Sequence, residues 1–234
     1  MKAALPANEQ ARLTALESYR ILDTAPEQAY DDIVAIAAFI CGTPIATVTL
    51  VDGTRQWFKS QTGLTFRESS RDHAFCAHTI LDSKLMEVPD AAQDARFANN
   101  PLVLGDPHIR FYAGAPLVTA EGLSIGSVCA IDREPRKLTD AQKSALERLA
   151  RLTMNNLELR RVSAELATAA TNLNTLSRLL PICAWCKEIR DDEGHWQKVE
   201  TYISHHTNAE FSHGMCPTCQ AKMMTDIKRK SSGA

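Results

Sequence analysis

The chain has 234 residues, 44% of them hydrophobic, and a formal net charge of −2. This length and composition predict a globular protein with one ordinary domain and one small one. The near-neutral charge gives no general attraction to nucleic acid or to anionic lipid. Residues 1–12 lack the apolar stretch of an export signal, so we expect a cytoplasmic protein.

The first third of the chain is predicted to begin with two helices. Residues 8–20 have the apolar spacing of a short amphipathic helix. A second helix is expected to begin after Thr24, because Glu27 three residues later completes a capping-box pattern. Gly42 marks its expected end.

One uncharged stretch, residues 33–51, has the length of a membrane span. Gly42 and Pro44 interrupt it, and Thr47 and Thr49 then alternate with apolar residues. This pattern is typical of a buried helix, a turn and a strand. We therefore expect no membrane segment.

Strand patterns dominate the following residues. Strands are expected at residues 46–51, 55–60, 85–88, 110–119 and 123–131. The first two flank Asp52-Gly53, a common signal for a short hairpin, and a helical stretch is expected near residues 72–82. The predicted fold class is α+β, with an antiparallel sheet covered by helices.

A long helix is predicted from Thr139, which forms a capping box with Gln142, to residue 180. Leucine recurs at every seventh position: Leu152, Leu159, Leu166, Leu173 and Leu180. With these at the d positions of a heptad, the a positions hold Leu149, Asn156, Ser163, Ala170 and Ser177. A leucine layer beside a largely polar layer predicts a weak parallel homodimer. The alternative is a helix that packs back on its own domain.

Two cysteine doublets lie near the C-terminus: Cys183 with Cys186, and Cys216 with Cys219. Each C-x2-C turn can present two sulfurs to one metal, so we predict a four-cysteine zinc site. The surrounding module, residues 181–234, has few large apolar groups. We therefore expect it to need a cross-link such as a bound metal ion for a stable fold. Ordinary thiols or a redox pair are the alternatives.

The order of elements expected in the module is a cysteine turn, a hairpin around residues 191–194, a helix at 200–206 and a helix beginning at Pro217. This would be a treble-clef-like arrangement. Four cysteines complete a structural zinc shell, so the nearby histidines are expected outside it: His195, His205, His206 and His213.

The module carries seven basic and seven acidic side chains, so it has no net charge. Nucleic-acid binding is therefore not expected, because neutralising phosphates requires a basic face. A closed four-cysteine shell also leaves no open position for water, and no catalysis is expected there. Contact with a protein partner is the favoured role.

Four runs resemble the GAF domain of bacterial signalling proteins over roughly residues 26–155. They are GTPIATVTLVDGTRQWFKSQTGL, RDHAFCAHTI, VPDAAQDARFANNPLV and IRFYAGAPLVTAEGLSIGSVCAIDREPRKLT. The resemblance implies a six-stranded antiparallel sheet with helices on both sides, a pocket that often holds a small molecule, and no catalysis by the domain. The run LPICAWCKEIRDDEGHWQKVE with FSHGMCPTC is similar to a tail found after bacterial sensory domains.

An unidentified small molecule in the pocket is thus an expected ligand. The candidate wall residues are Trp57, Phe58, Phe75, Cys76, His78, Arg110 and Tyr112. Ordinary packing is the alternative for each of them. The setting of Cys76 lacks the adjacent Cys-His pair of bilin-binding relatives. Cys41, Cys76 and Cys129 are also outside the pattern of the methionine sulfoxide reductases, so they are expected as small core residues.

The sequence therefore predicts four parts: an N-terminal helix (1–25), a GAF domain (26–138), a signalling helix (139–180) and a zinc module (181–234). The predicted function is a sensory or regulatory protein without enzymatic output. A thiol redox switch or reductase that uses the doublets is the first alternative. A nucleic-acid-binding regulator is the second.

Overall fold

The computed structural model describes residues 2–176, 180–191, 193–212 and 214–231. It divides into two units, Met1–Thr168 and Ala169–Ala234. Among the described residues, no helix is both long and apolar enough to cross a membrane.

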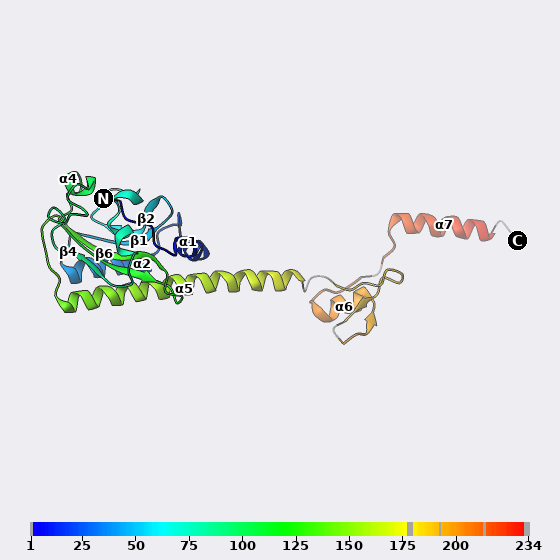
Figure 1. Cartoon of the computed structure of the whole chain (residues 1–234). Coiled ribbons are helices and arrows are strands. Elements are labelled where there is room, and N and C mark those ends of the chain that lie inside the picture. Colours follow the sequence, from blue (N-terminus) through cyan, green and yellow to red (C-terminus); the bar gives the residue numbers. More distant parts are fainter. Residues whose placement is uncertain (1, 177–179, 192, 213, 232–234) are drawn as a thin grey trace. The chain divides into compact units, whose positions relative to one another are not determined.

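The first unit is built on one antiparallel sheet (Figure 1). Its strands are β1 Ile45–Val51, β2 Arg55–Thr62, β3 Glu68–Ser70, β4 Met86–Val88, β5 Phe111–Val118 and β6 Ser124–Asp132. They lie in the order β3-β2-β1-β6-β5-β4. The expected α+β fold and six-stranded antiparallel sheet are confirmed. The strand patterns alone miss β3, because Glu-Ser-Ser contains no apolar residue to alternate.

Helices cover both faces of this sheet, and each face has its own hydrophobic core. One face is covered by α1 Glu9–Ser18, α2 Gln28–Cys41 and the first turns of α5 Asp140–Leu176. The other carries α3 Phe75–Thr79, which follows a 3-10 turn at Arg71–His73, and α4 Pro101–Leu104. In Figure 1, α2 and α5 lie on one side of the sheet and α4 on the other.

The expected cap of the second helix is wrong at its start and correct at its end. The helix begins at Gln28, and the Thr24 hydroxyl instead donates to the carbonyl oxygen of Ile21. The hydroxyl also accepts a hydrogen bond from the ammonium group of Lys59. This long-range contact takes the place of the capping interaction that the local sequence predicts. Gly42 ends the helix with φ of 64°, a conformation that favours glycine.

Helix α5 begins with the predicted capping box. The Gln142 N–H donates to Thr139 Oγ1 at 3.3 Å, and the Thr139 N–H donates to Gln142 Oε1 at 2.9 Å. One stripe of its first half is buried against the sheet: Leu146, Leu149, Ala150, Thr153 and Leu157. Packing on its own domain therefore does occur, and it buries Leu149, the first of the expected a positions, whereas the leucines at the d positions stay outside this stripe.

The leucines of the repeat face solvent. Leu152, Leu159 and Leu166 are 53%, 66% and 69% exposed. The side chain of Leu173, and Ser177, lie outside the described residues, while Leu180 follows the helix and is exposed. An apolar stripe thus continues along α5 beyond the part that packs on the sheet.

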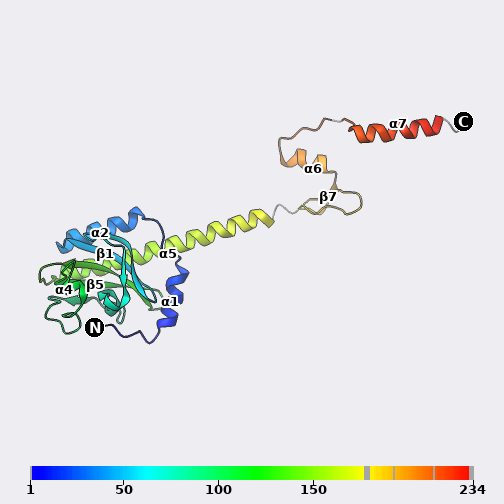
Figure 2. The ribbon, with the colours of Figure 1, turned by 90° about the horizontal axis from the view of Figure 1, so that it is seen from above.

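The second unit contains the expected elements in the expected order (Figure 2). They are β7 Ile189–Arg190, β8 Trp196–Gln197, α6 Val199–His206 and α7 Pro217–Ser231. Asp192 and His213 fall outside the described residues. Of the residues described from 180 onward, Ile189 alone is buried, so this unit has almost no apolar core.

Candidate functional site

The face of the sheet beneath α3 carries polar side chains in its centre. Strand register places Thr47 opposite Cys129 and Thr49 opposite Ser127. The hydroxyls of Thr47 and Thr49 lie 2.8 Å apart, and the Ser127 hydroxyl lies 3.1 Å from Cys129 Sγ. All four side chains are buried. Hydroxyl and thiol groups therefore form the centre of this face.

Tyr112 joins this floor because Gly114 leaves room for it. A Cβ atom at Gly114 would lie 2.2 Å from the Tyr112 hydroxyl oxygen, so the ring lies across the glycine. The hydroxyl then lies 2.7 Å from Thr79 Oγ1, 3.5 Å from Cys76 Sγ and 3.4 Å from Cys129 Sγ. Helix α3 and strands β5 and β6 therefore meet at one polar point.

Two thiols from distant parts of the sequence are in contact there. Cys76 Sγ on α3 lies 3.5 Å from Cys129 Sγ on β6. The hydrogen bond with Cys129 and burial raise the pKa of Cys76. Burial also raises the pKa of Cys129, but the hydrogen bond from Cys76 and those from Ser127, Tyr112 and Thr47 outweigh it and lower this pKa. The two thiols are therefore unequal, and Cys129 gives up its proton more readily than Cys76 does.

A small cavity of about 20 Å³ lies beside the thiols, enough for one water-sized molecule. Its walls are formed by Thr47, Gln56, Phe58, Leu64, Phe66, Phe75, Cys76, Leu102, Pro107, Ile109, Tyr112 and Ile131. Gln56 is 5% exposed and donates from Nε2 to Ser69 Oγ at 2.7 Å. Its Oε1 atom is buried and has no hydrogen-bond partner among the described residues. An unpaired buried acceptor on a cavity wall is a feature of a polar ligand site.

Four of the seven predicted pocket residues line this cavity: Phe58, Phe75, Cys76 and Tyr112. Trp57 belongs to the core on the opposite face, because neighbouring residues of a strand point to opposite sides. The His78 ring lies edge-on to Phe97, with centroids 4.8 Å apart. Arg110 precedes β5 and donates to the carbonyl oxygens of Val103 and Ile109 at 3.0 and 3.2 Å.

Sequence reasoning did not select Gln56 and Thr47. The alternation within Arg55–Thr62 could have indicated Gln56, which shares a face with Phe58. The position of Thr47 beside Cys129 depends on strand register, which no local pattern shows.

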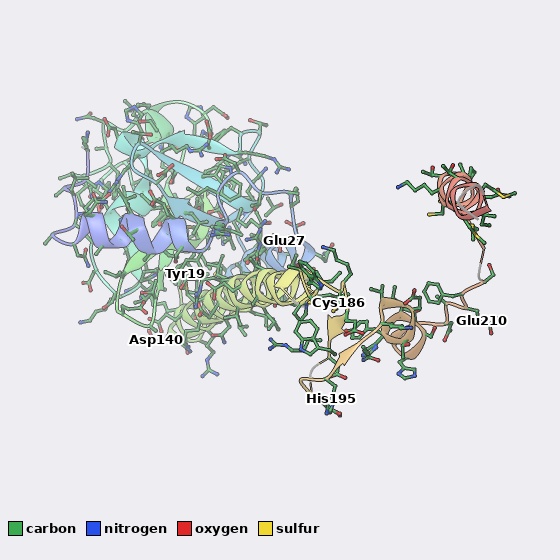
Figure 3. All side chains as sticks on the ribbon, turned by 90° about the vertical axis from the view of Figure 1, so that its right-hand side faces the viewer. Tyr19, Glu27, Asp140, Cys186, His195 and Glu210 are labelled. Atoms are coloured by element: carbon green, nitrogen blue, oxygen red, sulfur yellow. The ribbon has the colours of Figure 1, made fainter. Side chains whose placement is uncertain are left out.

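A group of ion pairs around Glu27, of which only the Lys59 side chain is fully enclosed, connects the sheet to α5. Lys59 lies next to Phe58 on β2, and its ammonium group donates to Glu27 Oε1 at 2.7 Å with its side chain fully enclosed. Arg160 of α5 donates to the same Glu27 oxygen at 3.2 Å and to the carbonyl oxygen of Tyr19. Figure 3 shows Tyr19 and Glu27 beside α5. Burial raises the pKa of Glu27, but Lys59 and Arg160 together lower it, so the carboxylate stays charged.

Each cysteine doublet has the local form of half a metal site. The Cys186 N–H donates to Cys183 Sγ at 3.5 Å, and the Cys219 N–H donates to Cys216 Sγ at 3.4 Å. Backbone N–H groups, first those of Cys186 and Cys219 respectively, lower the pKa of Cys183 and of Cys216 toward the thiolate form that binds metal. Lys187 closes the first turn with φ of 65°.

The described residues contain no cluster of three or more His, Cys, Asp or Glu side chains that could hold one metal ion. The two doublets are therefore formed locally but are not gathered into one shell.

The fold of the first unit, an antiparallel sheet with helices on both faces, is that of a sensory domain. The chain belongs to the GAF domain family, whose model matches residues 25–157. Over 150 residues it is 45% identical to a cyclic di-GMP phosphodiesterase of Pseudomonas aeruginosa, a match that covers 64% of this chain and 26% of that protein. The chain thus spans about a quarter of the length of this curated relative.

Solved structures show the same fold. The GAF domain of an Acinetobacter phosphoenolpyruvate-protein phosphotransferase has a TM-score of 0.50 and 15% sequence identity. That match covers 67% of this chain and 96% of the solved one. At this identity the likeness concerns the fold alone.

Proposed function

We propose that this chain is a sensory protein in which a small ligand in the GAF cavity changes the position of α5 and thereby the contacts of the C-terminal module. The observation that carries the proposal is the bridge through Glu27. It holds Lys59, next to the cavity-lining Phe58, and Arg160 of α5 at one carboxylate oxygen. A shift of β2 upon ligand binding would therefore reach α5 through Glu27, which contacts both the enclosed Lys59 and Arg160.

The proposal includes a parallel homodimer formed through α5. A repeat of exposed leucines at seven-residue spacing favours a second copy of the same helix as its partner, because identical stripes can pair in register. At about 1.5 Å per residue the 37 residues of α5 extend about 55 Å. A change at the sheet could thus be transmitted along the pair of helices.

The dimer is tested by replacing Leu159 and Leu166 together with lysine. Two charges buried in a weak seam should give monomers, since desolvating them costs more than the seam contributes. Thr168→Lys is the matched control, because position 168 falls on the outer face of the heptad and should leave the dimer intact. Sedimentation velocity measures the outcome. An unchanged sedimentation coefficient for the double variant would show that α5 does not form the seam.

For the C-terminal module we propose one structural zinc ion bound by Cys183, Cys186, Cys216 and Cys219. The preformed half-sites, with N–H groups directed at sulfur, support this. The exposure of its aromatic groups does so too: Trp185 is 95% exposed and Trp196 49%. Bound zinc would supply the cross-link that burial does not, and its binding free energy would become folding free energy. We propose a regulatory output without catalysis, because the closed shell leaves no site for water.

Metal analysis of protein purified under reducing conditions tests this directly, with about one zinc per chain expected. Cys216→Ser should lose the metal, while Thr218→Ala, within the same doublet, should keep it. Metal-free wild-type protein would favour the alternative of redox-active doublets.

A further inference from the structure

We infer that Cys76 and Cys129 form a reversible disulfide when a small hydroperoxide, of the size of hydrogen peroxide, enters the cavity beside them. The inference rests on the proposed sensory role only for its consequence, since the covalent step needs neither zinc nor a dimer. The proposed stimulus of the cavity is a small hydroperoxide, and the thiols that react lie outside the two cysteine doublets.

The two sulfurs are already in contact in the reduced protein. They lie 3.5 Å apart on separate elements, α3 and β6, and a disulfide requires an approach of about 1.5 Å. Cys76 lies on a helix of only five residues that follows a 3-10 turn, so little structure must move with it. Cys41, the third buried cysteine of this unit, belongs to the core on the opposite face, whereas Cys76 and Cys129 share the other core.

Cys76 lines the cavity, whereas Cys129 lies beneath and is fully buried. The space admits a molecule about as large as water, which excludes bulky oxidants. Gln56 Oε1, unpaired and buried on the same wall, can accept a hydrogen bond from a peroxide O–H group. The site thus limits the size of the oxidant, can accept a hydrogen bond from it and places a thiol beside it.

The reaction is balanced by the two thiols. Once Cys129 has lost its proton to solvent, Cys76 passes its own proton to the Cys129 sulfur 3.5 Å away and attacks the nearer peroxide oxygen as a thiolate. An S–O bond forms, the O–O bond breaks, and the hydroxide that leaves takes the proton back from Cys129 as water. The Cys129 thiolate then attacks Cys76 Sγ, the S–S bond forms, and the hydroxide that leaves takes a proton from solvent as a second water. The two sulfurs each lose one electron, and the peroxide is reduced to two waters. Hydroxyl groups around Cys129 stabilise its thiolate, the form that attacks.

The test uses the full-length wild-type chain, reduced and then freed of reductant. It is treated with hydrogen peroxide or with bulky cumene hydroperoxide, and disulfide-linked peptides are mapped by mass spectrometry without reduction. We expect a Cys76–Cys129 link with hydrogen peroxide, formed at least about tenfold faster than with cumene hydroperoxide after normalisation to free cysteine. The Cys41 peptide should remain unmodified and serves as the internal control.

Two results would overturn the inference. One is a reduced Cys76–Cys129 pair in a sample whose exposed doublets are oxidised. The other is equal linking by both oxidants, which would mean that the pair reacts through opening of the domain. Gln56→Leu, with its fold checked by circular dichroism, should slow linking by hydrogen peroxide about tenfold, the effect of one lost hydrogen bond. An unchanged rate would remove Gln56 from the site. Because the readout is a bond inside the first unit, its failure is separate from failure of the dimer or zinc experiments.

Discussion

The GAF domain and the C-terminal module differ in how much apolar surface they bury, and therefore in what can keep each of them folded. The domain buries a continuous apolar core on each face of its sheet, whereas the module buries Ile189 alone among its described residues. Burial therefore accounts for the stability of the first and cannot account for that of the second. The zinc ion proposed for the cysteine doublets would supply the cross-link that so small a core requires.

The sharpest way to break this comparison is to remove one large apolar side chain from each unit. Leu117→Ala, at a fully buried site of β5, should lower the free energy of unfolding of the domain by about 3 kcal/mol. Trp185→Ala, at a 95% exposed site, should change the stability of the module by less than about 0.5 kcal/mol. Hydrogen exchange in urea, followed separately for peptides of each unit, measures both. A loss of about 2 kcal/mol or more at Trp185 would reveal a core in the module.

Ion pairs sharpen the comparison within the domain. Glu27→Ala would leave the enclosed ammonium of Lys59 with only the neutral oxygens of Thr24 and Ala25, at an expected cost of about 3 kcal/mol. Asp23→Ala removes a 63% exposed partner of Arg55 and should cost less than about 0.5 kcal/mol. Urea unfolding monitored by circular dichroism compares them. Equal effects would show that the bridge to α5 contributes nothing beyond a surface pair.

The free energy of unfolding of the domain is expected to depend on pH through Glu9. This residue of α1 contacts Arg71, which follows β3. Burial raises the pKa of this carboxyl, but hydrogen bonds from Arg12 and Arg71 outweigh it and lower the pKa from 4.5 to about 2. A lowered pKa means that the stabilisation is complete above about pH 4.5 and is lost as the pH falls toward 2. Its full size is about 3 kcal/mol.

Comparing wild type with Glu9→Gln by urea unfolding should therefore give a difference of about 3 kcal/mol at pH 7, falling below about 1 kcal/mol at pH 2.5. Glu17→Gln, an exposed site on the same helix, is the control and should show no such trend. A pH-independent difference at Glu9 would mean that its charge is not what Arg12 and Arg71 hold.

Local patterns predicted those elements whose cause is local. The Gly42 stop, the hairpin around Asp52 and the capping box at Thr139 each depend on residues within a few positions, and the structure contains all three. The cap at Thr24 was predicted wrongly, because Lys59, 35 residues away in sequence, recruits both its hydroxyl and Glu27.

The candidate site was only partly predictable for the same reason. The contact between Cys76 and Cys129 joins residues 53 apart and depends on the register of β6 and on Gly114, which makes room for Tyr112. The heptad leucines correctly indicated a long helix. They could not show that another stripe, from Leu146 to Leu157, packs on the sheet, since two apolar faces of one helix compete for the same pattern.

The measurement that tests the central claim most directly is hydrogen exchange of the intact chain before and after removal of zinc with a chelator. The account predicts that peptides within residues 181–220 lose their protection, while those within residues 25–157 keep it unchanged. Full protection of the C-terminal peptides in metal-free, reduced protein would contradict the claim that a metal holds the module together.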